Sequence, residues 1–335
     1  MDVPIPQIAA PNYWLADAQS VWRYLSTQLV RGRLKQIGTS SLGHPLHVVE
    51  YGPESGRPLM VIGGTHGHEP GTVAAAMNLI HCLEQGRDLA GHPQRRLLGA
   101  LEDIRLCVLP MLNPDGRLVC PLSFHAQGID TCTIYACGLQ NNGDLVPYDA
   151  DSQEPCYHFP PKKCLFMGGQ FNGAGYAINR RRSTEASSAV EVAAALDFTL
   201  DRRPEAILDL HACGYNFAFQ ARSHEAPYWP VMREWQQRAE GLFRVKGRVL
   251  KPLHGDGDPP TPPLFHFNSS LFHRHGHLMW IAFEGRQGYL GRSSFMPLPT
   301  HWEIVDDYLS AVTVFSELGH EGHYEEANRA VFGPT

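Results

Sequence analysis

The 335-residue chain has no long apolar run and no cluster of basic residues. A membrane-spanning helix needs about 20 consecutive apolar residues, and no stretch approaches that length. Lys and Arg together number 28 against 34 Asp and Glu, so the formal net charge is −6. Nucleic acids and anionic membrane surfaces attract concentrated positive charge. We therefore expect neither a nucleic-acid partner nor a membrane partner.

The chain also lacks a secretory signal and a paired-cysteine metal motif. Its first residues, Met1 to Pro6, form neither a basic n-region nor an apolar h-region. The eight cysteines include a group between Cys120 and Cys164, whose spacings do not match the close pairs of a structural zinc site. We expect a cytoplasmic protein with free thiols. A disulfide or a structural metal within this group is the alternative.

Short apolar runs alternate with longer amphipathic segments along the chain. The sequence predicts strands at 34–38, 46–51, 59–62, 103–109, 206–210 and 278–283, and helices at 14–30, 72–84, 185–200, 228–241 and 302–318. Such alternation is typical of an α/β fold with a mixed or largely parallel sheet. No linker divides the chain, so we expect one domain over residues 1–335. Residues 118–175 lack periodicity and predict an irregular loop insertion that carries function.

Polar side chains follow four of the predicted strands. His66, Asn113, His211 and Glu284 each lie at or just beyond the carboxyl end of an apolar run. Open α/β sheets place their functional sites at this edge. The sequence therefore predicts that these four residues converge on one site.

The segment Gly63–Glu69 reads Gly-Gly-Thr-His-Gly-His-Glu and follows the predicted strand at 59–62. A catalytic zinc takes three protein ligands and keeps one position open for water. His66 and Glu69 supply two candidates, and His211 supplies the third. Asp209 precedes His211 by two residues, so it shares a strand face with His211 and can orient it. The alternative is a loop histidine beside a solvated glutamate.

Two further groups have the chemistry that such a site needs. Glu284 ends an apolar strand, where partial burial raises the pKa of a carboxylate towards that of a general base. Its alternative is a helix-capping glutamate or an ion-paired one, with Arg286 as the candidate partner. Asn179 and Arg180 can bind a carboxylate through an amide and a bidentate guanidinium. Their alternative is a solvated basic turn.

The order and spacing of these residues, from about Gly38 to Gly288, resemble the zinc metallocarboxypeptidases, the carboxypeptidase A-like M14 family. Asn113-Pro114-Asp115-Gly116 is part of the resemblance. It implies an α/β/α three-layer sandwich around a mixed, mostly parallel, eight-stranded sheet. It further implies one Zn²⁺ per chain, held by three ligands, with a general base and a pair of residues for the substrate's terminal carboxylate: His66, Glu69, His211, Glu284, Asn179 and Arg180.

The sequence departs from that family at two positions. No arginine lies between Arg117 and Arg180, where the family often has the cation that polarises the scissile carbonyl. Arg117 is the nearest candidate for this role. No tyrosine lies between Tyr228 and Tyr289, where the family has a mobile tyrosine that closes over the substrate. The candidates to replace it are two histidines and a later tyrosine: His266, His273 and Tyr289.

The function expected from the resemblance is zinc-dependent hydrolysis of an amide bond next to a free carboxylate. Release of a C-terminal amino acid from a peptide or peptide-like substrate is the first hypothesis. The second is an N-acyl amino acid deacylase, because Gly63–Glu69 and Asp209-Leu210-His211 also resemble the aspartoacylase and succinylglutamate desuccinylase branch. Asn113–Gly116 favours the peptidase. A binding protein with a dead site is the third hypothesis.

One further histidine pair superficially resembles a zinc-protease motif. His320-Glu321-Gly322-His323 is one residue shorter than the helical His-Glu-x-x-His pattern and lies near the C-terminal end of the sequence. We interpret it as a solvated terminus rather than a metal site.

Overall fold

The protein is described here by a computed structural model of residues 8–147, 158–179, 189–220, 225–253, 268–290 and 298–334. The described helices are α1 (Ala18–Thr27), α2 (Pro70–Gln85), α3 (Arg95–Ala100), α4 (Pro114–Leu118), α5 (Ile129–Cys137), α6 (Val190–Arg202), α7 (Tyr228–Val245), α8 (Asn268–Gly276), α9 (His301–His320) and α10 (His323–Phe332), with a 3-10 turn at Pro161–Lys163. None of these helices is long and apolar enough to cross a membrane.

The central sheet runs in the order β1-β2-β4-β3-β7-β9-β8. Its strands are β1 (Arg33–Thr39), β2 (Pro45–Tyr51), β3 (Arg57–Ile62), β4 (Ile104–Leu109), β7 (Ala206–Ala212), β8 (Phe217–Gln220) and β9 (Met279–Gly285). The four central strands are parallel, and the flanking strands β1, β2 and β8 pair antiparallel. The predicted mixed sheet, parallel at its centre, is confirmed. Among the described residues this sheet has seven strands, whereas the family resemblance implied eight.

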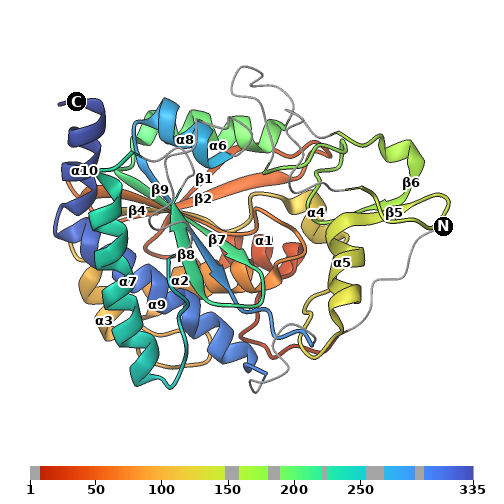
Figure 1. Ribbon diagram of the computed structural model, residues 1–335, viewed down its shortest axis with the longest axis horizontal. Coiled ribbons are helices and arrows are strands. Elements are labelled where there is room, and N and C mark those ends of the chain that lie inside the picture. The colour runs from red at the N-terminus through yellow and green to blue at the C-terminus, as the bar shows by residue number, and fades with distance from the viewer. Residues whose placement is uncertain are drawn as a thin grey trace.

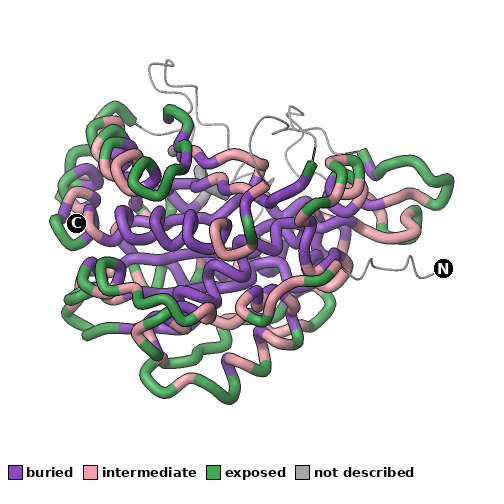
Figure 2. The backbone as a smooth tube through the Cα atoms, turned by 90° about the horizontal axis from the view of Figure 1, so that it is seen from below, coloured by how far each residue is buried: buried purple, intermediate pink, exposed green. Residues whose placement is uncertain are grey.

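Helices cover both faces of this sheet, which makes three layers (Figure 1). Alternate residues of each strand point to opposite faces. On β3, Leu59 and Val61 belong to the core under α2, α7 and α9. Met60 and Ile62 belong to the second core, which includes residues of α6 and α8. Buried residues accordingly fill the middle of the molecule, and exposed residues lie at its periphery (Figure 2).

Helix α2 carries the chain from β3 back under the sheet. It begins at Pro70, whose fixed φ suits the first helical position, and ends before Gly86 in a left-handed conformation (φ 76°). Small residues are concentrated in its first half, and every residue from Pro70 to Ile80 is buried. The consequence for the site is that Glu69 occupies the N-cap position of a helix fixed in the core.

The segment predicted as an irregular insertion contains regular structure. Helix α5 is followed by β5 (Gly138–Gln140), which pairs antiparallel with β6 (Cys164–Met167). These elements lie together at one end of the molecule (Figure 1). The expectation of little regular structure was therefore wrong for this segment. Free thiols, as expected, are found among the described cysteines at Cys82, Cys107, Cys120, Cys137, Cys164 and Cys213.

The C-terminal segment is a folded helix rather than a solvated tail. His320 ends α9, Gly322 adopts a left-handed conformation, and His323 begins α10. Tyr324 of α10 is fully buried and donates a hydrogen bond to the carbonyl of Phe315 (3.0 Å). The interpretation as a terminus in solvent was wrong, although His320 itself is exposed.

Candidate metal centre

The turn from β3 into α2 presents the first two candidate ligands. Gly64 has a left-handed φ of 61°, which favours glycine, and a Cβ on Gly67 would lie 2.0 Å from the carbonyl carbon of Gly116. Thr72 closes the turn, because its hydroxyl accepts from the Gly64 amide (3.0 Å) and donates to the Glu69 carbonyl (2.7 Å). The glycines of the motif therefore allow the backbone conformation and the close main-chain approach that this turn requires.

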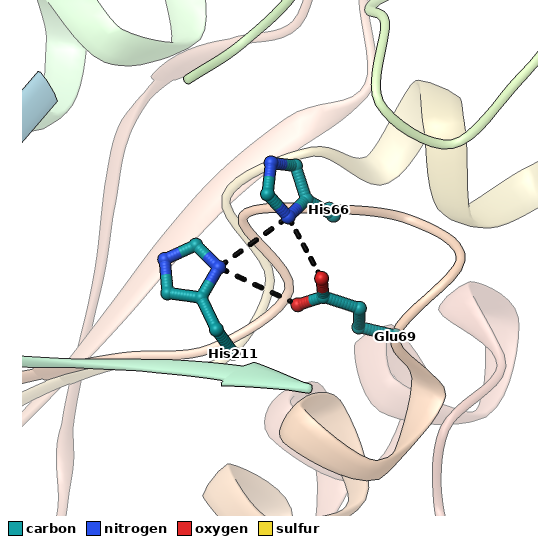
Figure 3. A group of neighbouring side chains, drawn as sticks. All are labelled: His66, Glu69 and His211. Carbon is teal, nitrogen blue, oxygen red and sulfur yellow. Dashed lines mark hydrogen bonds and ion pairs between the residues drawn. The ribbon is translucent and has the colours of Figure 1, made fainter. Parts of the chain in front are cut away.

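The third candidate ligand, His211, comes from the neighbouring parallel strand β7. His211 Nδ1 lies 3.3 Å from His66 Nδ1 and 3.5 Å from Glu69 Oε2 (Figure 3). His66 Nδ1 lies 2.8 Å from Glu69 Oε1. All three side chains are buried, and each offers one ligand atom within 4.8 Å of the others. The predicted convergence of these three residues is confirmed.

The donor set of these three residues fits a zinc ion. A tetrahedral zinc with bonds of ~2.05 Å places its ligand atoms ~3.3 Å apart, which matches the separation of the two imidazole nitrogens. Two nitrogens facing each other at this distance need a shared proton or a cation between them. Two imidazoles and one carboxylate leave a fourth position open, as catalytic zinc sites do.

The charges of the site also suit a cation. Burial alone would raise the pKa of Glu69, but the charge of His66 and hydrogen bonds with His211 and His66 lower it below its usual range. Burial alone would lower the pKa of His211, yet Asp209 and Glu69 raise it well above its usual value. Because a ligand histidine must be neutral, metal binding here would displace a proton.

Asp209 holds His211 from behind, as the sequence predicted. Its Oδ2 lies 3.0 Å from His211 Nε2, and its Oδ1 accepts a hydrogen bond from the Thr65 hydroxyl (2.8 Å). A carboxylate on the outer nitrogen of a ligand histidine fixes the ring and makes the other nitrogen a better ligand. The arrangement directs Nδ1 of His211 towards the other two candidate ligands.

Glu284 is the penultimate residue of β9 and lies directly beside His211, since the two residues are register partners in the parallel pair β7–β9. Burial raises the pKa of Glu284 to about 7, with Glu69 adding to the rise and His211 opposing it. Arg286 donates to Asp307 (2.8 Å). The alternative interpretation, an ion pair between Glu284 and Arg286, is therefore not what the structure shows.

A comparison with known protein families matches residues 24–238 to the zinc carboxypeptidases, peptidase family M14. This match covers more than half of the chain. The chain belongs to the zinc carboxypeptidase family. No curated protein sequence matches it.

Solved structures of metallocarboxypeptidases share the fold at low sequence identity. A metallo-carboxypeptidase from Burkholderia cenocepacia is 16% identical, with a TM-score of 0.59 over 91% of this chain and 69% of that one. Bovine thrombin-activatable fibrinolysis inhibitor, solved with a tick carboxypeptidase inhibitor, is 14% identical, with a TM-score of 0.59 over 93% and 100%. A Pseudomonas aeruginosa metallo-carboxypeptidase is 16% identical, with a TM-score of 0.56 over 90% and 67%. These likenesses support the fold.

Arg117, predicted as the oxyanion cation, contacts the main chain in this member of the zinc carboxypeptidase family. The guanidinium is buried, with Nη1 donating to the carbonyl of Gly67 and Nη2 donating to Cys120 (2.8 Å) and Pro121. The bond to Gly67 holds the loop between the candidate ligands His66 and Glu69. The oxyanion role stays a prediction, and the contacts favour a role in fixing this loop.

The other predicted site residues differ in how far the structure describes them. Arg180 and His266 lie outside the described residues. Asn179 is partly buried, and its Oδ1 has no hydrogen-bond partner within the described part of the chain. Tyr289 is buried and donates to the carbonyl of Cys213 (2.5 Å). His273 is buried, and its Nδ1 lies 2.7 Å from the carbonyl oxygen of Leu278.

Sequence reasoning missed His68, which lies beside the candidate ligands His66 and Glu69. Its Nε2 is 3.7 Å from Glu69 Oε1, and its ring centroid is 5.5 Å from that of His66. Burial lowers the pKa of His68 to about 3, so the ring is neutral. Its position inside the motif, directly before Glu69, could have predicted from the sequence that His68 lies in the site.

An aromatic row beside Glu284 was also missed. Phe217 is the register partner of Glu284 across β8 and β9, and Phe219 is the partner of Ala282. Opposed residues in antiparallel strands share a face, so both rings lie on the face that carries Glu284. Trp280 continues the row, with its ring 6.3 Å from that of Phe219. The wall that these rings form next to Glu284 is apolar.

Asp115 of the Asn-Pro-Asp-Gly motif joins two distant loops. Its carboxylate accepts from the hydroxyls of Ser40 (2.5 Å) and Ser41 (2.7 Å) and from the amides of Leu42 (3.2 Å) and Gly173 (3.0 Å). Asn113 adds hydrogen bonds to the carbonyls of Gly169 (3.1 Å) and Phe171 (3.0 Å). The motif thus fixes the chain that leads to Asn179.

Replacing Asp115 with alanine is expected to lower the free energy of unfolding by about 2–4 kcal/mol, because four donors, of which the Ser40 hydroxyl is buried, lose the charged acceptor that Asp115 provides. Urea unfolding followed by circular dichroism measures the change. Asp130→Ala, at an exposed position of α5, is the matched control and should stay within about 0.5 kcal/mol of the unsubstituted protein. Equal stability of the two variants would contradict the role of Asp115.

Proposed function

We propose that this zinc carboxypeptidase-family protein hydrolyses an amide bond next to a free carboxylate and releases a C-terminal amino acid from a peptide or peptide-like substrate. The observation that carries the proposal is the convergence of two histidines and a glutamate within 4.8 Å, with Glu284 beside His211 in the sheet. Family membership supports the class of reaction.

The residues divide the work of such a reaction between them. His66, Glu69 and His211 would hold one Zn²⁺, which when bound polarises the scissile carbonyl and makes its water acidic. Glu284 accepts the proton of the attacking water and delivers it to the leaving amine. Asp209 keeps His211 oriented throughout, since its carboxylate lies 3.0 Å from the ring.

The carboxylate requirement rests on Asn179 and Arg180. An amide and a guanidinium next to each other suit the two oxygens of a terminal carboxylate. The motif anchored by Asp115 leads the chain from Gly173 towards Asn179, whose buried Oδ1 lacks a partner among the described residues. These two residues would place the scissile amide at a fixed distance from the metal.

The rate is expected to fall as the pH drops below about 7. Before metal binds, burial raises the pKa of Glu284 to about 7. A bound cation lowers that pKa, so the acidic limb of kcat/KM should have its midpoint at or below this value. A pH profile of kcat/KM, with circular dichroism to verify folding at each pH, measures it. A rate that rises on acidification from about pH 7 to 5 would contradict the role of Glu284 as base.

The proposed reaction is tested by a product-resolved assay on the zinc-loaded protein. Peptides with free C-termini, the same peptides with C-terminal amides, and N-acyl amino acids are compared by mass spectrometry. Release of single amino acids from the free-carboxylate peptides alone supports the proposal. Cleavage of N-acyl amino acids alone supports a deacylase. This is the second candidate, and the amino-acid sequence of Gly63–Glu69 favours it. Binding of stoichiometric zinc without turnover of any amide would contradict both the carboxypeptidase and the deacylase.

A further inference from the structure

Two consecutive residues of α9 contact the ends of the two strands that carry His211 and Glu284. Tyr308 is fully buried, and its hydroxyl donates to the main-chain carbonyl of His211 (2.7 Å). Asp307 is also fully buried and accepts from Arg286 Nε (2.8 Å), two residues beyond Glu284. One turn of one helix therefore reaches both strand ends.

The fit between α9 and the end of β9 is close. A Cβ added at Gly285 would lie 2.4 Å from Cζ of Tyr308 and 2.5 Å from its hydroxyl oxygen. Glycine at this position lets the phenol approach the His211 carbonyl between the strand ends. The Tyr308 ring also packs edge-on against Phe283, with centroids 5.6 Å apart. The hydroxyl is thus held in place by contacts separate from its hydrogen bond.

The contact of Asp307 forms part of a buried network. Its carboxylate also accepts from Asn216 Nδ2 (2.9 Å), in the connection between β7 and β8, and from Arg248 Nη1 (2.7 Å). Three segments around the site are therefore tied to one side chain of α9. Asp307 keeps two donors if the hydrogen bond from Arg286 is removed.

We propose that Tyr308 and Asp307 are positioning residues that fix the separation of the metal ligand His211 from the base Glu284. The inference rests on the proposed function. His211 and Glu284 are register partners near the strand ends, where the ladder stops at Ala212 and Gly285. Beyond that point the amides of Cys213 and Gly214 still donate to the Gly285 carbonyl (3.1 and 3.3 Å), and the contacts from α9 fix the strand ends in addition. Tyr308 acts on the ligand, and Asp307 acts on the base through Arg286.

The ligand arm is tested with Tyr308→Phe and the matched control Tyr324→Phe. Both remove a buried phenol that donates to a backbone carbonyl, but Tyr324 contacts Phe315 and not the site. Zinc affinity is measured by chelator competition, and ligand geometry by the visible spectrum of the cobalt-substituted protein. Tyr308→Phe should bind zinc about three- to tenfold more weakly and shift the cobalt bands, while Tyr324→Phe should match the unsubstituted protein. Equal affinity and equal spectra in the two variants overturn this arm.

The base arm is tested with Arg286→Gln and the surface control Arg96→Gln, whose guanidinium pairs with Glu317. Arg286→Gln should lower kcat about tenfold with KM and zinc affinity unchanged, because the base and not the ligand is displaced. A kcat within twofold of the control overturns this arm. Failure of the unsubstituted protein to bind zinc overturns the proposed function instead, so the two failures are distinguishable.

Discussion

Glu284→Gln is expected to retain zinc and lose about 10³-fold in kcat. Glutamine keeps the size of the side chain but cannot accept a proton at neutral pH, and proton transfer by a positioned base contributes about 10²–10⁴-fold in enzymes. Glu284 is not among the three candidate ligands, so the metal should remain bound. The measurement is kcat on a cleaved substrate together with the zinc content of the same sample.

A control variant away from the site distinguishes the loss of the base from a general loss of negative charge. Glu317→Gln removes a carboxylate of α9 that pairs with Arg96. It should leave both kcat and zinc content unchanged. An active Glu284→Gln variant would remove Glu284 from the mechanism, and loss of zinc in that variant would instead make it a ligand.

His66→Ala is expected to reduce bound zinc from one equivalent to below about 0.1 and to abolish turnover. Two remaining ligands, Glu69 and His211, do not hold zinc against dialysis as three do, since catalytic sites take three protein ligands. Metal content is measured by elemental mass spectrometry after dialysis against a weak chelator. Thermal unfolding in the presence and absence of zinc reports the same loss, because zinc should no longer raise Tm.

The control for this prediction uses the second histidine motif. His320 is exposed, and its Nδ1 lies 3.1 Å from the carbonyl oxygen of Glu102. His320→Ala should keep one equivalent of zinc and full turnover. If His320→Ala lost the metal and His66→Ala kept it, the site would have been assigned to the wrong end of the chain.

The centre of the fold was predictable because its signals are local. The run Leu59–Ile62 is apolar on both faces, as parallel central strands are, and it ends at the glycines that the turn needs. His66, Glu69 and His211 follow such runs, and the parallel strands bring them to one edge. Residue type and place along the chain were sufficient for these three.

The rest depended on contacts between distant segments. Arg117 lies next to a family motif, yet its donors reach the carbonyls of Gly67 and Cys120, which no local pattern predicts. Helix α10 begins at His323 after a glycine, and its Tyr324 is buried. This segment, which the sequence predicted to be solvated, therefore packs against the rest of the protein. Tyr308 falls within the helix predicted at 302–318, and its contact with the strand end at His211 appears only in three dimensions.

The central claim, that His66, Glu69 and His211 hold one hydrolytic zinc, is tested most directly by titrating metal-stripped protein with Zn²⁺ while following substrate cleavage. The account predicts no turnover without metal and a linear rise that breaks at one equivalent per chain. Turnover that persists after complete removal of metal, or that needs no zinc to reach its maximum, would contradict it.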